Sequence, residues 1–515
     1  AISRKFAEIT LSSRTIAMLS QIPSTLTGDI SLNSRGAQKP YRITNDTELD
    51  LDIWIANEDP NNKKGLTTLR AKETIPWEFE DWRTIRENLN VDSEGSNIVA
   101  SVVGSKYKTV MKVDATYEGE LLFVLQPAVN HVHNRMTCDL QLGEDNVKTI
   151  TFRSTLVLEN TTMTTIELKV ETDDNKEPIT YSISSSDCHS VPVESSYGSK
   201  LRLKPSTEDG EFDWSEQMIS WRDLLSSSIP LRCKSKTDPN RVFYIEVNGK
   251  YDGKEPLAKI YPRMRIIVSS PLVIENCLPC DLNFTLYDEK QEHKKLTLLK
   301  KGSRVPVHDV SLNNFLLLAI QPLVDDAPLS KPSIVNTATR SSLKPETRIT
   351  TKLAGGQRFH AAIHYQSVEG TRAKILQLSA PYIILNKTGR DLYIQGDRTN
   401  IAQAKVQRLG DEKFTIPKMF SFDTDGHNKN RALVRFKESD WSLPLSFDAL
   451  GQSLDTVVNI PNKEQESNLG VTIIEGEGEH LFSKIVEIAP RYIIQNCLDL
   501  PVEICDFGST NVSQL

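Results

Sequence analysis

The sequence predicts an all-β fold, a tandem array of four β-sandwich-like repeats plus the start of a fifth. Three observations predict it. A pattern of an apolar run, an asparagine and a second apolar run returns five times, the returns lie 110 to 116 residues apart, and apolar residues alternate within each run. A fixed period of this length is typical of one unit copied in tandem. A unit of about 110 residues is also long enough to bury its own core.

The apolar residues that flank each asparagine occupy the same four offsets in every copy. The asparagines are Asn45, Asn160, Asn276, Asn386 and Asn496. Four and two residues before them stand Tyr41 and Ile43, Leu156 and Leu158, Leu272 and Ile274, Tyr382 and Ile384, and Tyr492 and Ile494. Six and eight residues after them stand Leu51 and Ile53, Ile166 and Leu168, Leu282 and Phe284, Leu392 and Ile394, and Val502 and Ile504. A spacing of two is the side-chain period of a strand, so we expect one strand on each side of every asparagine.

The asparagine itself is expected to close the turn between these two strands. Its short amide can bond to its own backbone two residues on, which forms an Asx turn. A functional role is the alternative: some copies hold a partner-binding strand edge in shape, so that a substitution is felt at a ligand site. Both interpretations remain open for all five asparagines.

A second landmark accompanies the asparagines. Four β-branched residues each precede a proline that stands 30 to 32 residues after its asparagine: Ile75-Pro76, Val191-Pro192, Val305-Pro306 and Ile416-Pro417. A residue before proline is held extended, and proline in a sheet is confined to edges, strand starts or bulges. We therefore expect each repeat to begin a strand, or present a sheet edge, at this place.

The period sets the expected domain boundaries. They are an N-terminal arm at residues 1–39, repeats at 40–153, 154–269, 270–379 and 380–488, and the start of a fifth repeat at 489–515. Trp82–Leu89 and Trp221–Leu225 are candidate short helices within the first two repeats.

Composition excludes several classes of protein. The net charge is −7, with 61 basic and 68 acidic residues interspersed, whereas a nucleic-acid interface needs a basic patch. The longest apolar run, Phe315–Ile320, is far shorter than the roughly 18 residues of a membrane-spanning helix. The seven cysteines are odd in number and do not recur once per repeat, which favours a reducing, cytoplasmic setting over stapled extracellular modules.

No catalytic, cofactor-binding or metal-binding residue is predicted. Cys277 and Cys280 have the spacing of half a zinc site, but no second pair exists. His131 and His133, like His360 and His364, lack a matching set of carboxylates or cysteines. The threonines that follow Asn45, Asn160 and Asn386 by two residues complete glycosylation sequons, and we attribute them to the turn.

The segments around four of the asparagines, starting at Pro40, Pro271, Ala380 and Ala489, carry a resemblance. From about Pro40 to its end, the chain resembles the adaptor-binding (VAB) domain of the vacuolar-protein-sorting-thirteen bridge-like lipid transport proteins, whose repeats each carry one signature asparagine. The second repeat departs from the pattern, with Thr155 where proline is expected.

The resemblance implies a non-enzymatic scaffold without cofactors. Its implied ligands are short proline-containing motifs, of the Pro-x-Pro type, in organelle adaptor proteins. Docking them would target a lipid-transfer protein to membrane contact sites, so the implied location is cytoplasmic and peripheral, with membrane association only through adaptors. The chain would then be part of a larger lipid-transfer chain, with its principal adaptor groove among the last repeats, and the five asparagines would be turn or adaptor-edge residues.

Two other classes of function stay open from the residues alone. An extracellular tandem β-sandwich adhesion array predicts bridged cysteines and glycans on Asn45, Asn160 and Asn386. An all-β carbohydrate-active enzyme predicts a single cleft with two carboxylates at a separation suited to acid–base chemistry.

Overall fold

A computed structural model describes residues 37–514. It leaves out 57–62, 80–96, 173–176, 289–295, 339–342, 354–355, 397–400, 410–411, 424–430, 462–464 and 506–511, and the single residues 105, 130, 144, 209, 256, 325, 369, 449, 452, 493 and 499. Most of the expected N-terminal arm and the candidate helix Trp82–Leu89 therefore lie outside the described residues. The chain divides into two compact units that separate at Ser270 and Pro271, with residues 369–371 counted in the first unit.

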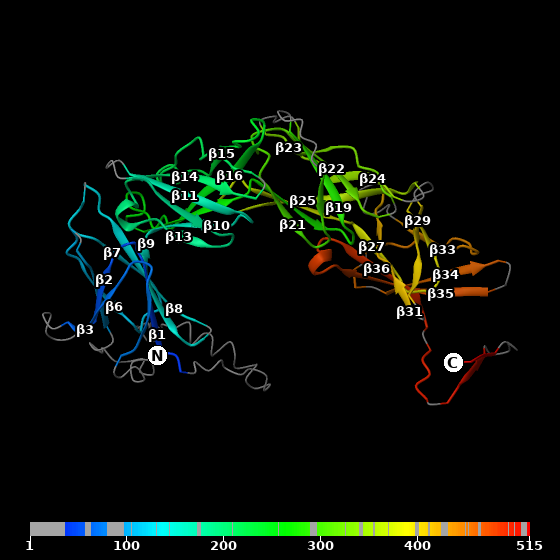
Figure 1. Ribbon diagram of the computed structural model, residues 1–515. Helices are drawn as coiled ribbons and strands as arrows, with labels where there is room; N and C mark the ends of the chain where they lie inside the picture. The colour runs from blue at the N-terminus through cyan, green and yellow to red at the C-terminus, as the bar shows by residue number, and fades with distance from the viewer. Residues whose placement is uncertain are drawn as a thin grey trace, which may run out of the picture. The chain divides into compact units, whose positions relative to one another are not determined.

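The first repeat consists of two sheets (Figure 1). The five-stranded sheet has the order β4-β1-β9-β8-β7, and the four-stranded sheet has the order β3-β2-β5-β6. The strands are β1 (Tyr41–Asp46), β2 (Leu51–Ile55), β3 (Lys64–Leu69), β4 (Thr74–Trp77), β5 (Asn97–Val102), β6 (Val110–Asp114), β7 (Gly119–Val124), β8 (Arg135–Leu142) and β9 (Lys148–Ser154).

The second repeat has the same plan. Its sheets have the orders β13-β10-β17-β16-β15 and β12-β11-β14. The elements are β10 (Leu156–Asn160), β11 (Thr165–Thr172), β12 (Ile179–Ile183), β13 (Cys188–Ser190), the 3-10 turn η2 (Val193–Ser195), β14 (Ser199–Ser206), β15 (Ile229–Lys234), β16 (Val242–Tyr251) and β17 (Met264–Ser269).

The third repeat opens the second compact unit, with sheets of order β21-β18-β26-β25-β24 and β20-β19-β22-β23. The strands are β18 (Leu272–Cys277), β19 (Leu282–Asp288), β20 (Thr297–Leu299), β21 (Arg304–Val307), β22 (Leu316–Pro322), β23 (Ser333–Asn336), β24 (Arg348–Lys352), β25 (Arg358–Ser367) and β26 (Lys374–Ser379).

The fourth repeat has sheets of order β32-β27-β36-β35-β34 and β29-β28-β33, and a β30-β31 hairpin. Its elements are β27 (Tyr382–Asn386), β28 (Leu392–Gln395), β29 (Ile401–Ala404), β30 (Val406–Leu409), β31 (Glu412–Thr415), β32 (Lys418–Phe420), β33 (Leu433–Phe436), β34 (Ser453–Ile460), β35 (Gln465–Glu475), η4 (Gly478–His480) and β36 (Lys484–Pro490). A hairpin of β37 (Glu503–Cys505) and β38 (Val512–Gln514) follows.

Each repeat is closed by one parallel strand pair. The strand that ends near the asparagine pairs in parallel with the last strand of the same repeat: β1 with β9, β10 with β17, β18 with β26 and β27 with β36. Parallel strands need a long crossover connection, and here the connection is nearly the whole repeat. One or two residues (Thr155, Ser270–Pro271, Ala380–Pro381) then join this last strand to the first strand of the next repeat.

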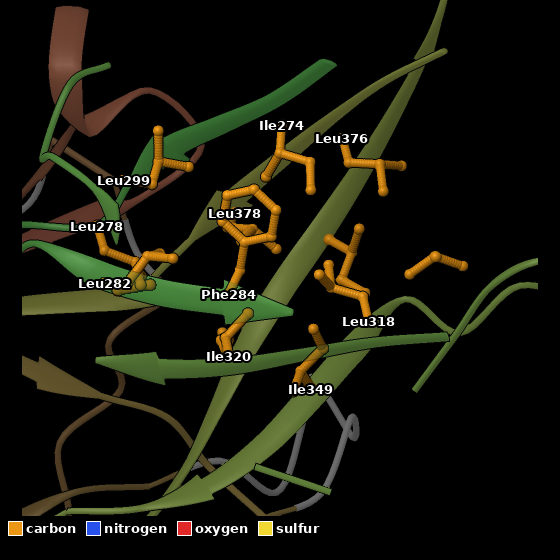
Figure 2. Packing of buried hydrophobic residues seen from close by; sticks show 14 of the residues in the cluster. Ile274, Leu278, Leu282, Phe284, Leu299, Leu318, Ile320, Ile349, Leu376 and Leu378 are labelled. Carbon is orange, nitrogen blue, oxygen red and sulfur yellow. The ribbon is translucent and has the colours of Figure 1, made fainter. Parts of the chain in front are cut away.

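The cores confirm the alternation predicted from the sequence. All sixteen flanking positions of the first four asparagines are buried, none more than 8% exposed. They belong to four clusters, one per repeat. Figure 2 shows the third, where Phe284 of β19 and Leu378 of β26 come from the two opposite sheets. Each repeat is thus a sandwich with its own core, and the all-β tandem fold is confirmed.

The proline landmark marks an edge strand in every repeat, but not one fixed position. β4, β13, β21 and β32 each lie at the edge of a five-stranded sheet. Pro76 and Pro306 lie within such strands, opposite Arg42 and Val273. Pro192 follows β13, whereas Ile416-Pro417 precedes β32. The similar spacing of 30 to 32 residues from the asparagine therefore hides a shift of the proline, relative to its edge strand, by about two residues in either direction.

Two other expectations are modified. Trp221–Leu225 forms turns rather than a helix, with the N–H of Leu224 donating to the Trp221 carbonyl at 3.2 Å. The Trp221 ring is anchored in the core, where its Nε1 donates to the Tyr197 carbonyl. Around Asn496, Tyr492 and Ile494 are 71% and 61% exposed and lie in no described strand, because none of the described strands pairs with this segment.

Among the described residues, no helix has the length and apolar character needed to cross a membrane.

Candidate functional site

The side chain of Asn45 connects both sheets of the first repeat. Its Nδ2 donates to the carbonyl of Leu49 at 2.7 Å, of Leu69 at 3.1 Å and of Arg70 at 3.0 Å. Its Oδ1 accepts from the N–H of Thr47 at 3.2 Å, the bond of an Asx turn, and from the Thr47 hydroxyl at 2.6 Å. The amide thus ties the turn after β1 to the end of β3 in the other sheet.

The other asparagines repeat this arrangement. Each donates Nδ2 to the carbonyl four residues on (Thr164, Cys280, Arg390, Leu500) and accepts at Oδ1 from the N–H two residues on (Thr162, Leu278, Thr388, Leu498). Asn160, Asn276 and Asn386 also donate to the far sheet, at Ile183 and Ser184, at Leu299 and at Ala404 respectively. The first four asparagines are at most 1% exposed.

This burial decides what the asparagines can do. Their amide nitrogens already donate to main-chain carbonyls, so the three sequon asparagines are inaccessible to glycan attachment in the folded chain. Where threonine follows by two residues, its hydroxyl bonds the asparagine oxygen at 2.6 to 2.7 Å, which accounts for the sequon in the turn. Any effect of these residues on a ligand must pass through the turn that they hold.

The turn of the first repeat lies against the second repeat. The Ser190 hydroxyl on β13 donates to the carboxylate of Asp46, directly after the asparagine. Val193, just beyond β13, is buried in the core cluster of the first repeat. The Asn45 turn is therefore part of the contact between these two repeats.

A pocket of about 200 Å³ lies at this contact. It is formed by the Asn45 turn, the strands β11 and β12 with Glu177 just before β12, and the segment after β13. The residues are Thr47, Glu48, Leu49, Val170, Thr172, Glu177, Ile179, Tyr181, Pro192, Val193, Glu194 and Ser195. Half of them are apolar and three are glutamates, so the pocket suits an apolar group with a cationic neighbour.

Burial shifts the pKa values of two neighbouring side chains, Tyr181 and His189. Desolvation, with the charge of Glu48, raises the pKa of the Tyr181 hydroxyl to about 12. The Tyr181 ring packs 4.2 Å from the ring of His189. Burial and then the charge of Lys72 lower the pKa of His189, whose Nε2 is buried without a hydrogen-bond partner among the described residues. Both side chains are therefore neutral at pH 7.

A main-chain edge borders the pocket. β12 contributes Ile179 and Tyr181, and among the described strands it pairs only with β11. Ile179 is 48% exposed. An unpaired edge next to an apolar pocket is the arrangement by which sheets accept an additional strand.

The other candidate residues lie in structural contacts. Burial raises the pKa of the Cys277 thiol to about 11, and Cys280 Sγ lies 4.0 Å from Met419 Sδ. His360 Nε2 is 3.1 Å from Asp423 Oδ1, and His364 Nε2 is 2.9 Å from the Ser379 hydroxyl. All seven cysteines are described, and none of them forms a disulfide bond. In the described part of the chain, no group of three His, Cys, Asp or Glu could hold a metal ion.

A lysine that recurs at the same position in three repeats was not recognised from the sequence. Lys148, Lys374 and Lys484 each begin the closing parallel strand, opposite the residue four before the asparagine. Their ammonium groups donate to the carbonyl of Thr116 (3.1 Å), to Asn336 Oδ1 (2.9 Å) and to Asp448 Oδ1 (3.2 Å). The spacing of 98 to 103 residues after the asparagine was visible in the sequence, but Met264 at this position in the second repeat obscured it.

Comparison with known proteins is consistent with this repeat pattern. The family model described as vacuolar-sorting associated protein 13, adaptor binding domain, matches residues 81–515. Intermembrane lipid transfer protein VPS13 of Chaetomium thermophilum is 33% identical over 99% of this chain and 16% of its own length. Vps13D of Drosophila melanogaster is 24% identical over 48% of this chain and 6% of its own length. VPS13D of Homo sapiens is 22% identical over 68% of this chain and 8% of its own length.

The chain thus spans less than a fifth of each of these relatives. The family match nevertheless covers most of the chain, and it agrees with the resemblance seen in the asparagine-centred repeats. The chain belongs to the vacuolar-sorting associated protein 13 adaptor binding domain family.

Proposed function

We propose that this chain is a non-enzymatic adaptor-binding scaffold that docks short proline-containing segments of partner proteins. We place one docking site at the pocket between the first two repeats, with the peptide added as a strand along β12. The observation that carries this proposal is the pocket itself, where an unpaired sheet edge, the Asn45 turn and an apolar lining meet. The family match supports the adaptor-binding role in general terms.

The geometry of strand addition favours prolines two residues apart. In an added strand, alternate N–H groups face the host edge and the others face outward. Prolines at positions i and i+2 can therefore both direct their missing N–H groups away from β12, while the residue between them still bonds to the edge. A second effect is that the outer edge of the added strand cannot recruit another chain.

The lining gives the proposed ligand its side-chain preferences. A proline ring fits among Leu49, Ile179 and Tyr181, where it buries apolar surface without a donor to satisfy. Glu48, Glu177 and Glu194 favour lysine or arginine beside the prolines. Because Lys72 already forms an ion pair with Glu48 at 3.2 Å, the other two glutamates carry most of this preference.

In the whole protein, we propose that such docking positions a lipid-transfer chain at membrane contact sites. The relatives are named intermembrane lipid transfer proteins, and this chain matches a small part of each. We place the chain in the cytoplasm, where adaptors rather than its own residues hold it at membranes. The principal adaptor groove implied by the family among later repeats would then act together with this pocket.

Fluorescence anisotropy tests the site with two labelled peptides, one with a Pro-x-Pro core and its Ala-x-Ala twin. We expect the first to bind at least about tenfold more tightly, and Ile179→Arg to remove the difference because the new charge occupies the pocket mouth. Leu298→Arg is the matched control, since Leu298 is 52% exposed on β20, the counterpart of β12 in the third repeat. Equal binding of the peptides, or equal losses in both variants, would contradict the proposal.

A further inference from the structure

A second pocket lies between the first two repeats and has the opposite charge. It measures about 350 Å³ and is formed by β7 and β9 of the first repeat and by β16 and β17 with the residues next to them in the second. Its lining includes four cationic side chains, Arg153, Lys250, Arg263 and Arg265, and two carboxylates, Glu120 and Asp252. The lining therefore carries a net charge of +2, in a chain whose net charge is −7.

One carboxylate is shared by two of the guanidinium groups. Glu120 forms ion pairs with both Arg153 and Arg263. Asp139 is 4.0 Å from Arg153 and contributes weakly. The side chain of Arg153 is only 13% exposed, and desolvation lowers its pKa, with the charge of Arg265 acting in the same direction. Arg153 is thus held at the base of the pocket with its orientation fixed by Glu120.

Lys250 and Arg265, the other two cationic residues of the lining, lie opposite each other on neighbouring strands. Lys250 on β16 and Arg265 on β17 are direct cross-strand partners, so their side chains lie on the same face of the sheet. Like charges at such positions are destabilising. Arg265 has one counterion, Glu159, at 3.5 Å, whereas Lys250 is exposed and makes no ion pair or hydrogen bond in the described part of the chain. An anion placed between them would relieve this repulsion.

We propose that this pocket binds a phosphate monoester carried on a peptide, such as a phosphoserine or phosphothreonine side chain. A phosphate monoester carries a charge of about −1.5 to −2 at pH 7, so it would supply a counterion to Lys250, which lines the pocket and forms no ion pair in the described part of the chain. Its oxygens accept charge-assisted hydrogen bonds from Lys250, Arg263 and Arg265. Glu120 is a positioning residue, because it holds two guanidinium groups in place without contacting the ligand.

The neighbouring strand favours a peptide as the carrier. Glu120 lies on β7, which among the described strands pairs only with β8 and leaves its other edge open. An extended segment can add to this edge by main-chain hydrogen bonds while one side chain reaches the pocket. This site is separate from the pocket at the Asn45 turn, which we call the acidic pocket because its lining contains Glu48, Glu177 and Glu194. The ligand of the site described here needs no proline.

A proline-free, fluorescein-labelled peptide with one central phosphoserine tests the proposal on the whole chain, against its unphosphorylated serine twin. We expect the phosphopeptide to bind at least about tenfold more tightly, and this preference to weaken as ionic strength rises from about 0.05 M to about 0.3 M. Lys250→Glu should abolish the preference, and Lys250→Arg should retain it. Lys200→Glu is the matched control, because Lys200 is exposed on β14 away from the pocket.

Several results would overturn the proposal. The peptides could bind equally, or Lys250→Glu and Lys200→Glu could have the same effect. Phosphatidylcholine vesicles containing a phosphatidylinositol phosphate could retain the chain in a Lys250-dependent way while the phosphopeptide neither binds nor competes, which would assign the pocket to a membrane. If a variant fails to fold, the proposal is still tested by comparing the affinities of the phosphorylated and unphosphorylated peptides for the unmodified chain.

Discussion

Asn45 donates its side-chain amide to the main-chain carbonyl of Leu69, 24 residues away on the opposite sheet, at 3.1 Å. This bond crosses the sandwich at one end of the first repeat and fixes the turn that lines the acidic pocket. The same link to the far sheet is present in the next three repeats. The recurring asparagine is therefore first a structural clamp, and we propose that it supports adaptor binding through the turn it holds.

Asn45→Ser should lower the free energy of unfolding of the first repeat by about 2–4 kcal/mol, because three main-chain carbonyls, that of Leu69 in a buried hydrogen bond, lose a donor that serine is too short to replace. Asn240→Ser, at an exposed turn position, should cost less than about 0.5 kcal/mol. Urea denaturation measures both effects. A loss of peptide affinity per folded molecule at unchanged stability would show that Asn45 acts at the binding edge rather than as a clamp.

Five of the seven cysteines should divide into two groups when the native chain is treated with iodoacetamide at pH 8. Burial raises the pKa of the Cys277 thiol to about 11 and of the Cys233 thiol to about 12, and it also raises that of Cys138, so these three should stay unmodified until unfolding. Exposed Cys497 and Cys505 should react first. Mass spectrometry reads the sites, and disulfide-linked peptides in native protein would instead support the adhesion-array alternative.

Acidification should destabilise the second compact unit through His364. Its ring stacks on Phe482 at 4.2 Å, and burial lowers its pKa. The unfolded chain, with an ordinary pKa near 6.5, takes up a proton that the folded chain excludes, so stability falls as pH decreases below about 6.5 towards the lower folded pKa. His364→Gln should flatten this dependence in thermal unfolding. An unchanged slope in His364→Gln would contradict this assignment.

Lys374→Met should change stability by less than about 1 kcal/mol, because methionine already fills the equivalent position as Met264, only 1% exposed. Lys374→Asp should cost about 1–3 kcal/mol, since it removes the hydrogen bond donated to Asn336 Oδ1 and places a carboxylate at this half-buried position. Both changes at exposed Lys352 should be nearly neutral. Denaturant unfolding distinguishes the variants, and similar costs for Met and Asp at Lys374 would contradict this prediction.

The repeats and their first two strands could be predicted because the pattern that indicates them lies within a few residues of each asparagine. Residues such as Ile43 and Ile53 alternate on either side of an asparagine, and this alternation alone places them in two strands with buried faces. The partner of β1 could not be found this way, since β9 follows about a hundred residues later and no local pattern states which strand will pair with it.

The two pockets could not be predicted from the sequence for a similar reason. The acidic pocket combines Leu49, Tyr181 and Glu194, which belong to three segments and two repeats. The basic pocket depends on the register that sets Lys250 opposite Arg265. Such registers vary between copies, as the displaced prolines at Pro192 and Pro417 show.

Hydrogen–deuterium exchange on the whole chain, with and without a saturating Pro-x-Pro peptide, tests the proposed docking most directly. An added strand must hydrogen-bond to the open edge of β12, so amides of Ile179–Ile183 should exchange more slowly in the complex, together with the Asn45 turn. The Ala-x-Ala twin should give no protection. Bound peptide with unchanged exchange throughout residues 177–183 would contradict the account.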